Sequence, residues 1–256
     1  MGLFDKKYCD VCGEKIGLLG NRKLEDGNLC KDCARKLSPW FSERRNSSVN
    51  EIKRQLEYRE ENRGRVEAFH ITRTLGSGTK LLLDEDAGLF MVTSAKNIAE
   101  ANPDVLALSD VTGCTLDIEE SSKELLREDK DGNEVSYNPP RYEYSYDFYI
   151  IVNVNNPYFN EMRFRINPNS VEISPPPSIR PGVTLRFNPE TNAEYKKYKQ
   201  LGEEIRQILV KVRDDVREKI EQAAAPKTAV SCPYCGATTT PDASGCCEYC
   251  GGAVNG

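Results

Sequence analysis

The stretch Tyr142-Glu-Tyr-Ser-Tyr-Asp-Phe-Tyr-Ile-Ile-Val-Asn-Val154 carries the strongest strand signal in the chain. Every second residue is aromatic or aliphatic, and most residues between them are polar. Such an alternation places the apolar side chains on one face of an extended strand. We therefore expect a half-buried strand here and a β-domain built around it.

Weaker strand patterns lie on both sides of this stretch. Asn155-Asn-Pro-Tyr158 supplies a turn, after which Met162, Phe164 and Ile166 return on one face. Five segments upstream also read as strands: Val66 to Thr74, Lys80 to Leu83, Gly88 to Val92, Val105 to Leu108 and Gly113 to Ile118. Turns rather than helical patterns separate these segments. The sequence therefore predicts an antiparallel β-sandwich or small barrel at residues 65–187.

Helical patterns flank the β-domain. Ser48 and Glu51 form a capping box, which predicts a connecting helix at residues 46–64 that ends at Gly64. A polyproline-type spacer at 174–182 then leads to one long amphipathic helix at 188–225. Its apolar stripe consists of Tyr195, Tyr198, Leu201, Ile205, Ile208, Val212, Val216 and Ile220. We expect the first half of this helix to cover the β-domain, and self-association through residues 195–220 is the less favoured alternative.

Eight of the ten cysteines form Cys-x-x-Cys pairs, two pairs near each end of the chain. They are Cys9, Cys12, Cys30, Cys33, Cys232, Cys235, Cys247 and Cys250. The pairs are separated by 17 residues at one end and 11 at the other, as in structural zinc sites with four thiolate ligands. We predict two structural Zn²⁺ ions, in a treble-clef-like module at 1–45 and a zinc ribbon at 226–256. Two unrelated redox dithiols are the alternative interpretation of the first two pairs.

Two cysteines fall outside this scheme. Cys246 competes with Cys247 for one position, but only Cys247 has the two-residue spacing to Cys250. Cys114 could serve a thiol-dependent enzyme only with a base, and His70 is the single histidine. The sequence therefore predicts no catalytic residue and no enzyme.

The net charge and the distribution of apolar residues indicate which class of partner and which cellular compartment to expect. The net charge is −5, and two zinc sites with four thiolates each contribute 2 × (−4 + 2) = −4, which gives −9. This acidity disfavours nucleic acid as a partner, because phosphate binding relies on clustered cations. The sequence shows neither a signal-peptide core nor a transmembrane segment, and paired cysteines are metal ligands in reducing compartments. We expect a cytoplasmic protein.

Three resemblances fit this reading. The opening Cys-Asp-Val-Cys-Gly and Leu-Cys-Lys-Asp-Cys-Ala resemble a small cysteine-rich domain of unknown function found in many bacterial proteins. The segment Val105-Leu-Ala-Leu-Ser-Asp-Val-Thr-Gly-Cys-Thr-Leu116, with the strong hairpin and long helix after it, is similar to bacterial pleckstrin-homology-like domains. The Cys-Pro-Tyr-Cys-Gly tail resembles bacterial zinc ribbons.

These resemblances imply an α+β multidomain architecture, in which two small four-cysteine zinc modules flank a pleckstrin-homology-like domain with a long C-terminal helix. They imply architecture more than activity. We expect a non-catalytic zinc-binding adaptor or scaffold for protein–protein interaction. A nucleic-acid-binding zinc-ribbon protein and a thiol-dependent enzyme are the alternatives.

Overall fold

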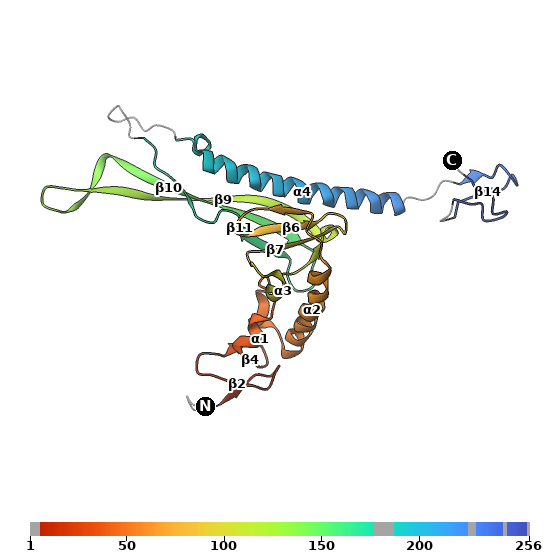
Figure 1. Ribbon diagram of the computed structural model, residues 1–256, viewed down its shortest axis with the longest axis horizontal. Helices are drawn as coiled ribbons and strands as arrows, with labels where there is room; N and C mark the ends of the chain where they lie inside the picture. Colours follow the sequence, from red (N-terminus) through yellow and green to blue (C-terminus); the bar gives the residue numbers. More distant parts are fainter. Residues whose placement is uncertain (1–5, 177–186, 225–228, 243–244, 255–256) are drawn as a thin grey trace. The chain divides into compact units, whose positions relative to one another are not determined.

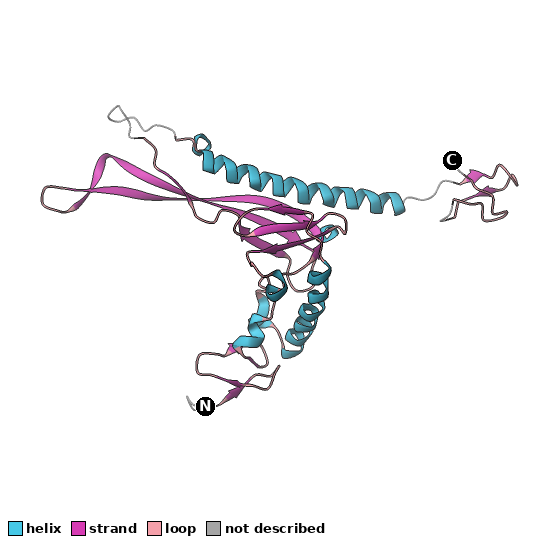
Figure 2. Cartoon of the chain, in the orientation of Figure 1, coloured by secondary structure: helices cyan, strands magenta, loops and turns pink. Residues whose placement is uncertain are grey.

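The computed structural model describes residues 6–176, 187–224, 229–242 and 245–254 (Figures 1 and 2). The chain divides into two compact units, Met1–Arg213 and Asp214–Gly256, and each is described by itself. The first unit contains the N-terminal cysteines and the β-domain, and the second contains the C-terminal cysteines. The fold is α+β, and all of its strand pairs are antiparallel.

Strand β10 (Glu134–Val154) is the central element of the first unit. One edge pairs with β9 (Val111–Glu128), and the other pairs with β11 (Glu161–Arg165) and β12 (Val171–Ile173). The predicted alternation is confirmed from Tyr146 onward, where every second side chain is buried: Tyr146, Phe148, Ile150, Val152 and Val154. Tyr144 is only half-buried, and Tyr142 is exposed. The strand is longer than predicted. The charged segment that precedes it also forms part of the β9–β10 hairpin, whose turn is closed by a hydrogen bond from Asp129 N to Asn133 O.

A second four-stranded sheet packs against the first. It has the order β5 (Arg73–Leu75), β6 (Lys80–Asp84), β7 (Leu89–Thr93) and β8 (Leu106–Ala107). Leu81, Leu83 and Phe90 join the β10 side chains in one hydrophobic core. Among the described residues both sheets are open, so the structure does not form a closed barrel.

Helix α2 (Val49–Ala68) begins with the predicted capping box. It runs through Gly64, because an exposed glycine weakens a helix without ending it, so the predicted end at residue 64 is wrong. Val66 is helical rather than the start of a strand, and it packs with Leu82 and Met91 on the outer face of the second sheet. The short helix α3 (Ile98–Ala101) borders the same cluster.

A buried polar network holds α2 against the β-domain. Asp104 is fully buried and accepts hydrogen bonds from Arg59 Nη1 at 2.7 Å and from Ser38 Oγ at 2.8 Å. Asn62 Nδ2 donates to Asn102 Oδ1 at 2.8 Å, and Arg59 Nη2 donates to the Asn102 carbonyl. Arg59 Nε also donates to the carbonyl of Lys36, which follows the short helix of the N-terminal cysteine module. These polar contacts fix the module and α2 to the same edge of the β-domain.

Helix α4 (Ala193–Ala224) follows the 3-10 turn η3 (Pro189–Thr191). Tyr195 packs edge-on against Tyr146 and Phe148. Ile205 and Leu209 are fully buried in the same core. The first half of the predicted self-association surface is therefore covered by the chain's own sheet, and the side chains of Val212, Val216 and Ile220 lie outside the described residues. Most of the predicted polyproline spacer, residues 177–182, also lies outside them.

Glycine permits a close approach of α4 to the sheet. A Cβ atom on Gly202 would lie 2.5 Å from Leu116 Cδ1, which is closer than side-chain atoms can pack.

Among the helices of the described ranges, none is long and apolar enough to cross a membrane.

Candidate metal centres

The first half of the N-terminal centre is a tight turn between two short strands, β1 (Lys7–Tyr8) and β2 (Lys15–Ile16). Within it, Gly13 N donates to Cys9 O at 2.8 Å and Cys9 N donates to Glu14 O at 2.9 Å. Gly13 has a φ of +76°, a conformation that glycine adopts without strain. This knuckle directs Cys9 and Cys12 to the same side.

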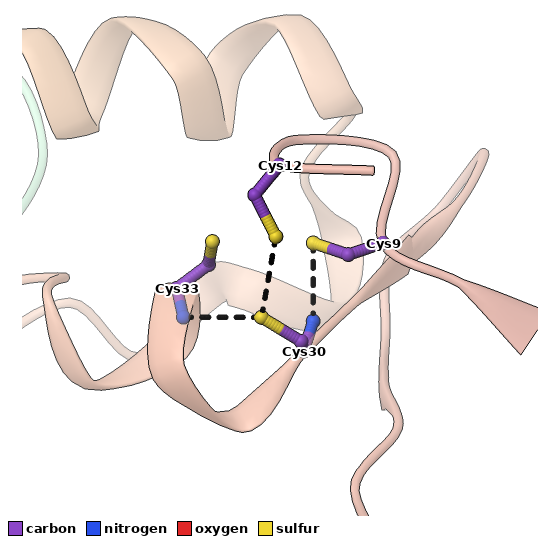
Figure 3. A group of neighbouring side chains, drawn as sticks. All are labelled: Cys9, Cys12, Cys30 and Cys33. Carbon is purple, nitrogen blue, oxygen red and sulfur yellow. Dashed lines mark hydrogen bonds between the residues drawn. The ribbon is translucent and has the colours of Figure 1, made fainter. Parts of the chain in front are cut away.

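The second half of the centre is the start of a helix. Strands β3 (Arg22–Lys23) and β4 (Asn28–Leu29) form a hairpin, closed by Leu24 N donating to Gly27 O. Cys30 follows as the N-cap of α1 (Lys31–Arg35). Its sulfur accepts a hydrogen bond from Cys33 N at 3.3 Å (Figure 3). A helix N-terminus favours a thiolate there, because its free N–H groups carry partial positive charge.

Asp10 joins the two halves and was not singled out in the sequence. Its Oδ2 accepts a hydrogen bond from Asn28 N at 2.6 Å, while its own N–H donates to Asn28 O at 2.9 Å. These reciprocal bonds fix the knuckle to the hairpin that leads into Cys30. Cys30 N in turn donates to Cys9 Sγ at 3.3 Å (Figure 3).

Two N-terminal thiols, Cys9 and Cys33, have pKa values shifted in opposite directions. Burial raises the pKa of Cys9, but the backbone N–H groups of Cys12, Cys30 and Val11 outweigh it and bring this pKa down to about 7. Burial, followed by the neighbouring thiols Cys12 and Cys30, raises the pKa of Cys33. The backbone thus stabilises the Cys9 thiolate, whereas burial and the neighbouring thiols oppose ionisation of Cys33. A bound divalent cation would stabilise the thiolate form of both.

The C-terminal centre consists of two matching knuckles. In the first, Gly236 N donates to Cys232 O and Cys232 N donates to Ala237 O; in the second, Gly251 N donates to Cys247 O and Cys247 N donates to Gly252 O. These are the same two bonds as in the Cys9 knuckle. Strands β13 (Val230–Ser231) and β14 (Thr238–Thr239) flank the first knuckle.

The thiols of the second knuckle also have shifted pKa values. Burial opposes ionisation of Cys247, but the backbone N–H groups of Tyr249 and Cys250 lower its pKa to about 6. The Gly252 N–H lowers the pKa of Cys250, but hydrogen bonds with the thiols of Cys235 and Cys232 outweigh this and raise it to about 12. The electrostatic pattern matches that of the N-terminal centre.

Both groups fit a tetrahedral metal. Within each, the four sulfur atoms lie within 4.8 Å of one another. The Sγ–Sγ distances are 3.7 Å for Cys12–Cys30, 3.5 Å for Cys232–Cys250 and 3.8 Å for Cys235–Cys247. Four sulfurs at ~2.3 Å from one zinc ion would be about 3.8 Å apart, whereas disulfide sulfurs lie about 2.05 Å apart. The two groups can each hold a metal ion, and their ligand chemistry is consistent with zinc.

The remaining sequence candidates lie apart from these groups. Cys246 is outside the C-terminal sulfur cluster; its N–H donates to Asp242 Oδ1 at 2.9 Å and it forms a β-bridge with Ala253. Cys114 lies half-buried in β9 and packs against the main core. His70 is exposed between α2 and β5, where its backbone N–H donates to Asp84 Oδ2.

The N-terminal part of the chain is similar to a known protein family. Residues 7–55 match the family described as Domain of unknown function (DUF4428). No curated protein and no solved structure matches the chain.

The matched range extends past the cysteines into α2, and the contacts give the reason. Val49 N, the first helical residue, donates to Asp26 Oδ1 at 2.8 Å, and Glu25 N donates to Ser47 O at 3.0 Å. Ile52 is fully buried in the core of the cysteine module. The start of α2 therefore belongs structurally to the cysteine module.

Proposed function

We propose that this chain is a non-catalytic adaptor that recognises a protein partner through its C-terminal zinc ribbon. The observation that carries the proposal is a pair of tyrosines at matching positions of the two knuckles. Tyr234 is 73% exposed and Tyr249 is 72% exposed. Tyrosine is enriched among the residues that dominate binding energy in protein interfaces.

The Tyr234 ring is held in place before any partner binds. A Cβ atom on Gly252 would lie 2.6 Å from Tyr234 Cδ2, so the ring lies directly over this glycine of the opposite knuckle. A pre-ordered aromatic side chain loses little conformational entropy on binding. Zinc supports this role by fixing the two knuckles that carry the rings.

The charge of the ribbon favours protein over nucleic acid. From Pro226 to Gly256 the sequence has two acidic residues, Asp242 and Glu248, and a single cationic residue, Lys227. A zinc ion held by four thiolates adds a further net charge of about −2. Exposed tyrosines can stack on bases, but phosphate binding relies on clustered cations, and this segment has only one.

Three further features belong to the same proposal. The two open antiparallel sheets, with α4 packed on their common core, support a pleckstrin-homology-like domain as the scaffold. Burial raises the pKa of Cys114 to about 12, which keeps it a neutral thiol and supports a non-catalytic role. Thiolate zinc sites favour a reducing compartment such as the cytoplasm.

The test uses a photo-crosslinking amino acid placed singly at position 234 or 249 of the full-length protein, expressed in its own host. We expect one protein partner to be crosslinked from both positions and not from position 142, where Tyr142 is also exposed, at 41%, but lies on β10. With the partner purified, Tyr234→Ala combined with Tyr249→Ala should weaken binding at least tenfold while zinc content stays unchanged. Crosslinks to nucleic acid, or unchanged affinity in the double variant, would overturn the proposal.

A further inference from the structure

The loop between β2 and β3 has unusual turn chemistry. Gly20 N donates to Gly17 O at 3.0 Å, so Leu18 and Leu19 occupy the two central positions of a tight turn. Glycine, proline, asparagine, aspartate and serine dominate such turns. Here the two leucine side chains are 90% and 89% exposed.

The loop backbone is held by its neighbours. Arg22 Nη1 donates to Leu19 O at 3.3 Å, and Asn21 Nδ2 donates to Asn28 Oδ1 at 2.8 Å. On the other side, Ile16 is buried in the core of the cysteine module. The module therefore presents two adjacent leucines from an anchored tip, at the cost of leaving their apolar surface in water.

Cationic residues lie on both sides of this apolar tip in the sequence. Residues 15–23 contain Lys15, Arg22 and Lys23 and no acidic residue. Arg44 Nη1 donates to the Lys23 carbonyl at 2.8 Å. Burial, then the positive charges of Arg45 and Arg22, lower the pKa of Arg44, so these cations lie close enough to repel one another.

An exposed apolar tip within a basic surround matches the chemistry of an anionic bilayer surface, where apolar side chains enter the acyl boundary and cations meet the headgroups. A convex two-residue tip offers little contact area to a rigid protein surface, whereas a fluid bilayer closes around it. We propose that the loop Gly17–Gly20 docks the zinc module onto anionic membranes, with Leu18 and Leu19 inserted and Lys15, Arg22 and Lys23 at the headgroups.

Binding of this kind is reversible and sensitive to salt. Two leucines provide a small inserted area, so the apolar and electrostatic contributions are both needed. Attraction between exposed cations and lipid headgroups weakens as ionic strength rises. We therefore expect retention on phosphatidylglycerol-containing vesicles at low salt, release at high salt, and little retention on phosphatidylcholine alone.

The experiment is co-sedimentation of the full-length, zinc-loaded protein with vesicles of phosphatidylcholine alone or mixed with an equal part of phosphatidylglycerol. Leu18→Ser with Leu19→Ser should weaken binding to the anionic vesicles about tenfold or more. Lys15→Gln with Lys23→Gln should weaken it and flatten its salt dependence. Leu126→Ser, which changes a leucine that is 45% exposed on β9, is the matched control and should bind like wild type.

Zinc content and sedimentation velocity of each variant separate docking from misfolding. Unchanged zinc content with lost vesicle binding supports the proposal. Absent wild-type binding, equal binding to neutral vesicles, or full binding by the leucine variant would overturn it, as would a leucine effect confined to self-association. Tyr234→Ala with Tyr249→Ala should bind vesicles normally, so this inference stands or fails independently of the proposed ribbon partner.

Discussion

At the scale of single residues, the adjacent cysteines Cys246 and Cys247 differ most clearly in their expected role in metal binding. Cys247 lies in the C-terminal sulfur cluster, whereas Cys246 bridges to Ala253 outside it. Cys247→Ser should therefore reduce the zinc content by one ion per chain, while Cys246→Ser should leave it unchanged. Elemental analysis after gel filtration measures both, and loss of zinc in the Cys246 variant instead would contradict the ligand assignment.

Outside the cysteine clusters, the ion pair between Arg59 and Asp104 is the contact whose loss we expect to reduce folding stability most. Its side chains are 7% and 0% exposed, so removal of Arg59 leaves a buried, unpaired carboxylate. Arg59→Met should lower the free energy of unfolding by about 3–5 kcal/mol. Urea unfolding followed by the fluorescence of Trp40, which packs against the β-domain core, measures the loss. Lys53→Met, on the exposed side of α2, is the matched control and should change stability little.

The effect of Arg59→Met should depend on pH in a defined direction. Burial raises the pKa of Asp104 above its ordinary value of 3.8, against the opposing effect of Arg59. A carboxyl whose pKa is raised by folding binds protons more readily in the folded state, so stability is gained as pH falls through that raised pKa and lost as pH rises. Without Arg59 the pKa rises further, and the deficit should be smaller near about pH 5.5 than near about pH 8. A deficit that grows on acidification would show that Asp104 is not the group left unpaired.

At the scale of elements, α2 explains where sequence reasoning succeeded and where it failed. The capping box correctly marked the start of the helix. Its buried positions, however, are Ile52, Gln55, Arg59, Asn62 and Val66, which follow helical spacing but include three polar residues. Hydrophobic periodicity cannot detect such a stripe, because the partners that satisfy Arg59 and Asn62 are contributed by the distant loop at 102–105.

The glycines of α2 and α4 should respond in opposite ways to substitution. Gly202→Leu forces side-chain atoms into Leu116 and should destabilise the protein by about 1–3 kcal/mol. Gly64→Ala, where nothing lies within 4 Å, should stabilise it by about 0.5–1 kcal/mol through helix propensity. Thermal unfolding of the two variants measures both signs. A tolerated leucine at 202 would mean that α4 does not approach β9 as closely as described.

At the scale of the whole molecule, the cysteine spacing and the alternation in β10 predicted the main components. Three of the four Cys-x-x-Cys pairs are followed by glycine and form the same hydrogen-bonded knuckle, which is local chemistry that a sequence can specify. The expectation that the first half of α4 covers the β-domain is also confirmed, because Tyr195, Tyr198, Ile205 and Leu209 are buried in the β-domain core. The sequence did not reveal that the charged segment before Tyr142 extends the β9–β10 hairpin, because strand pairing there overrides weak local propensity.

The two metal centres and the β-domain have separate sources of stability. The β-domain has its own core around Phe148 and Ile150, whereas the core of the C-terminal module consists of Cys232, Cys247 and Val254 with Val230 packed against it. A module with so small a core depends on its metal. Chelation should therefore remove the structure of the ribbon and leave the amides of β10 protected from hydrogen exchange.

The central claim is that the eight paired cysteines hold two zinc ions. X-ray absorption spectroscopy at the zinc edge, combined with elemental analysis of freshly purified, reduced protein, tests it most directly. We expect two zinc ions per chain, each with four sulfur neighbours at about 2.3 Å. Less than one zinc ion per chain, or nitrogen and oxygen neighbours in place of sulfur, would contradict it.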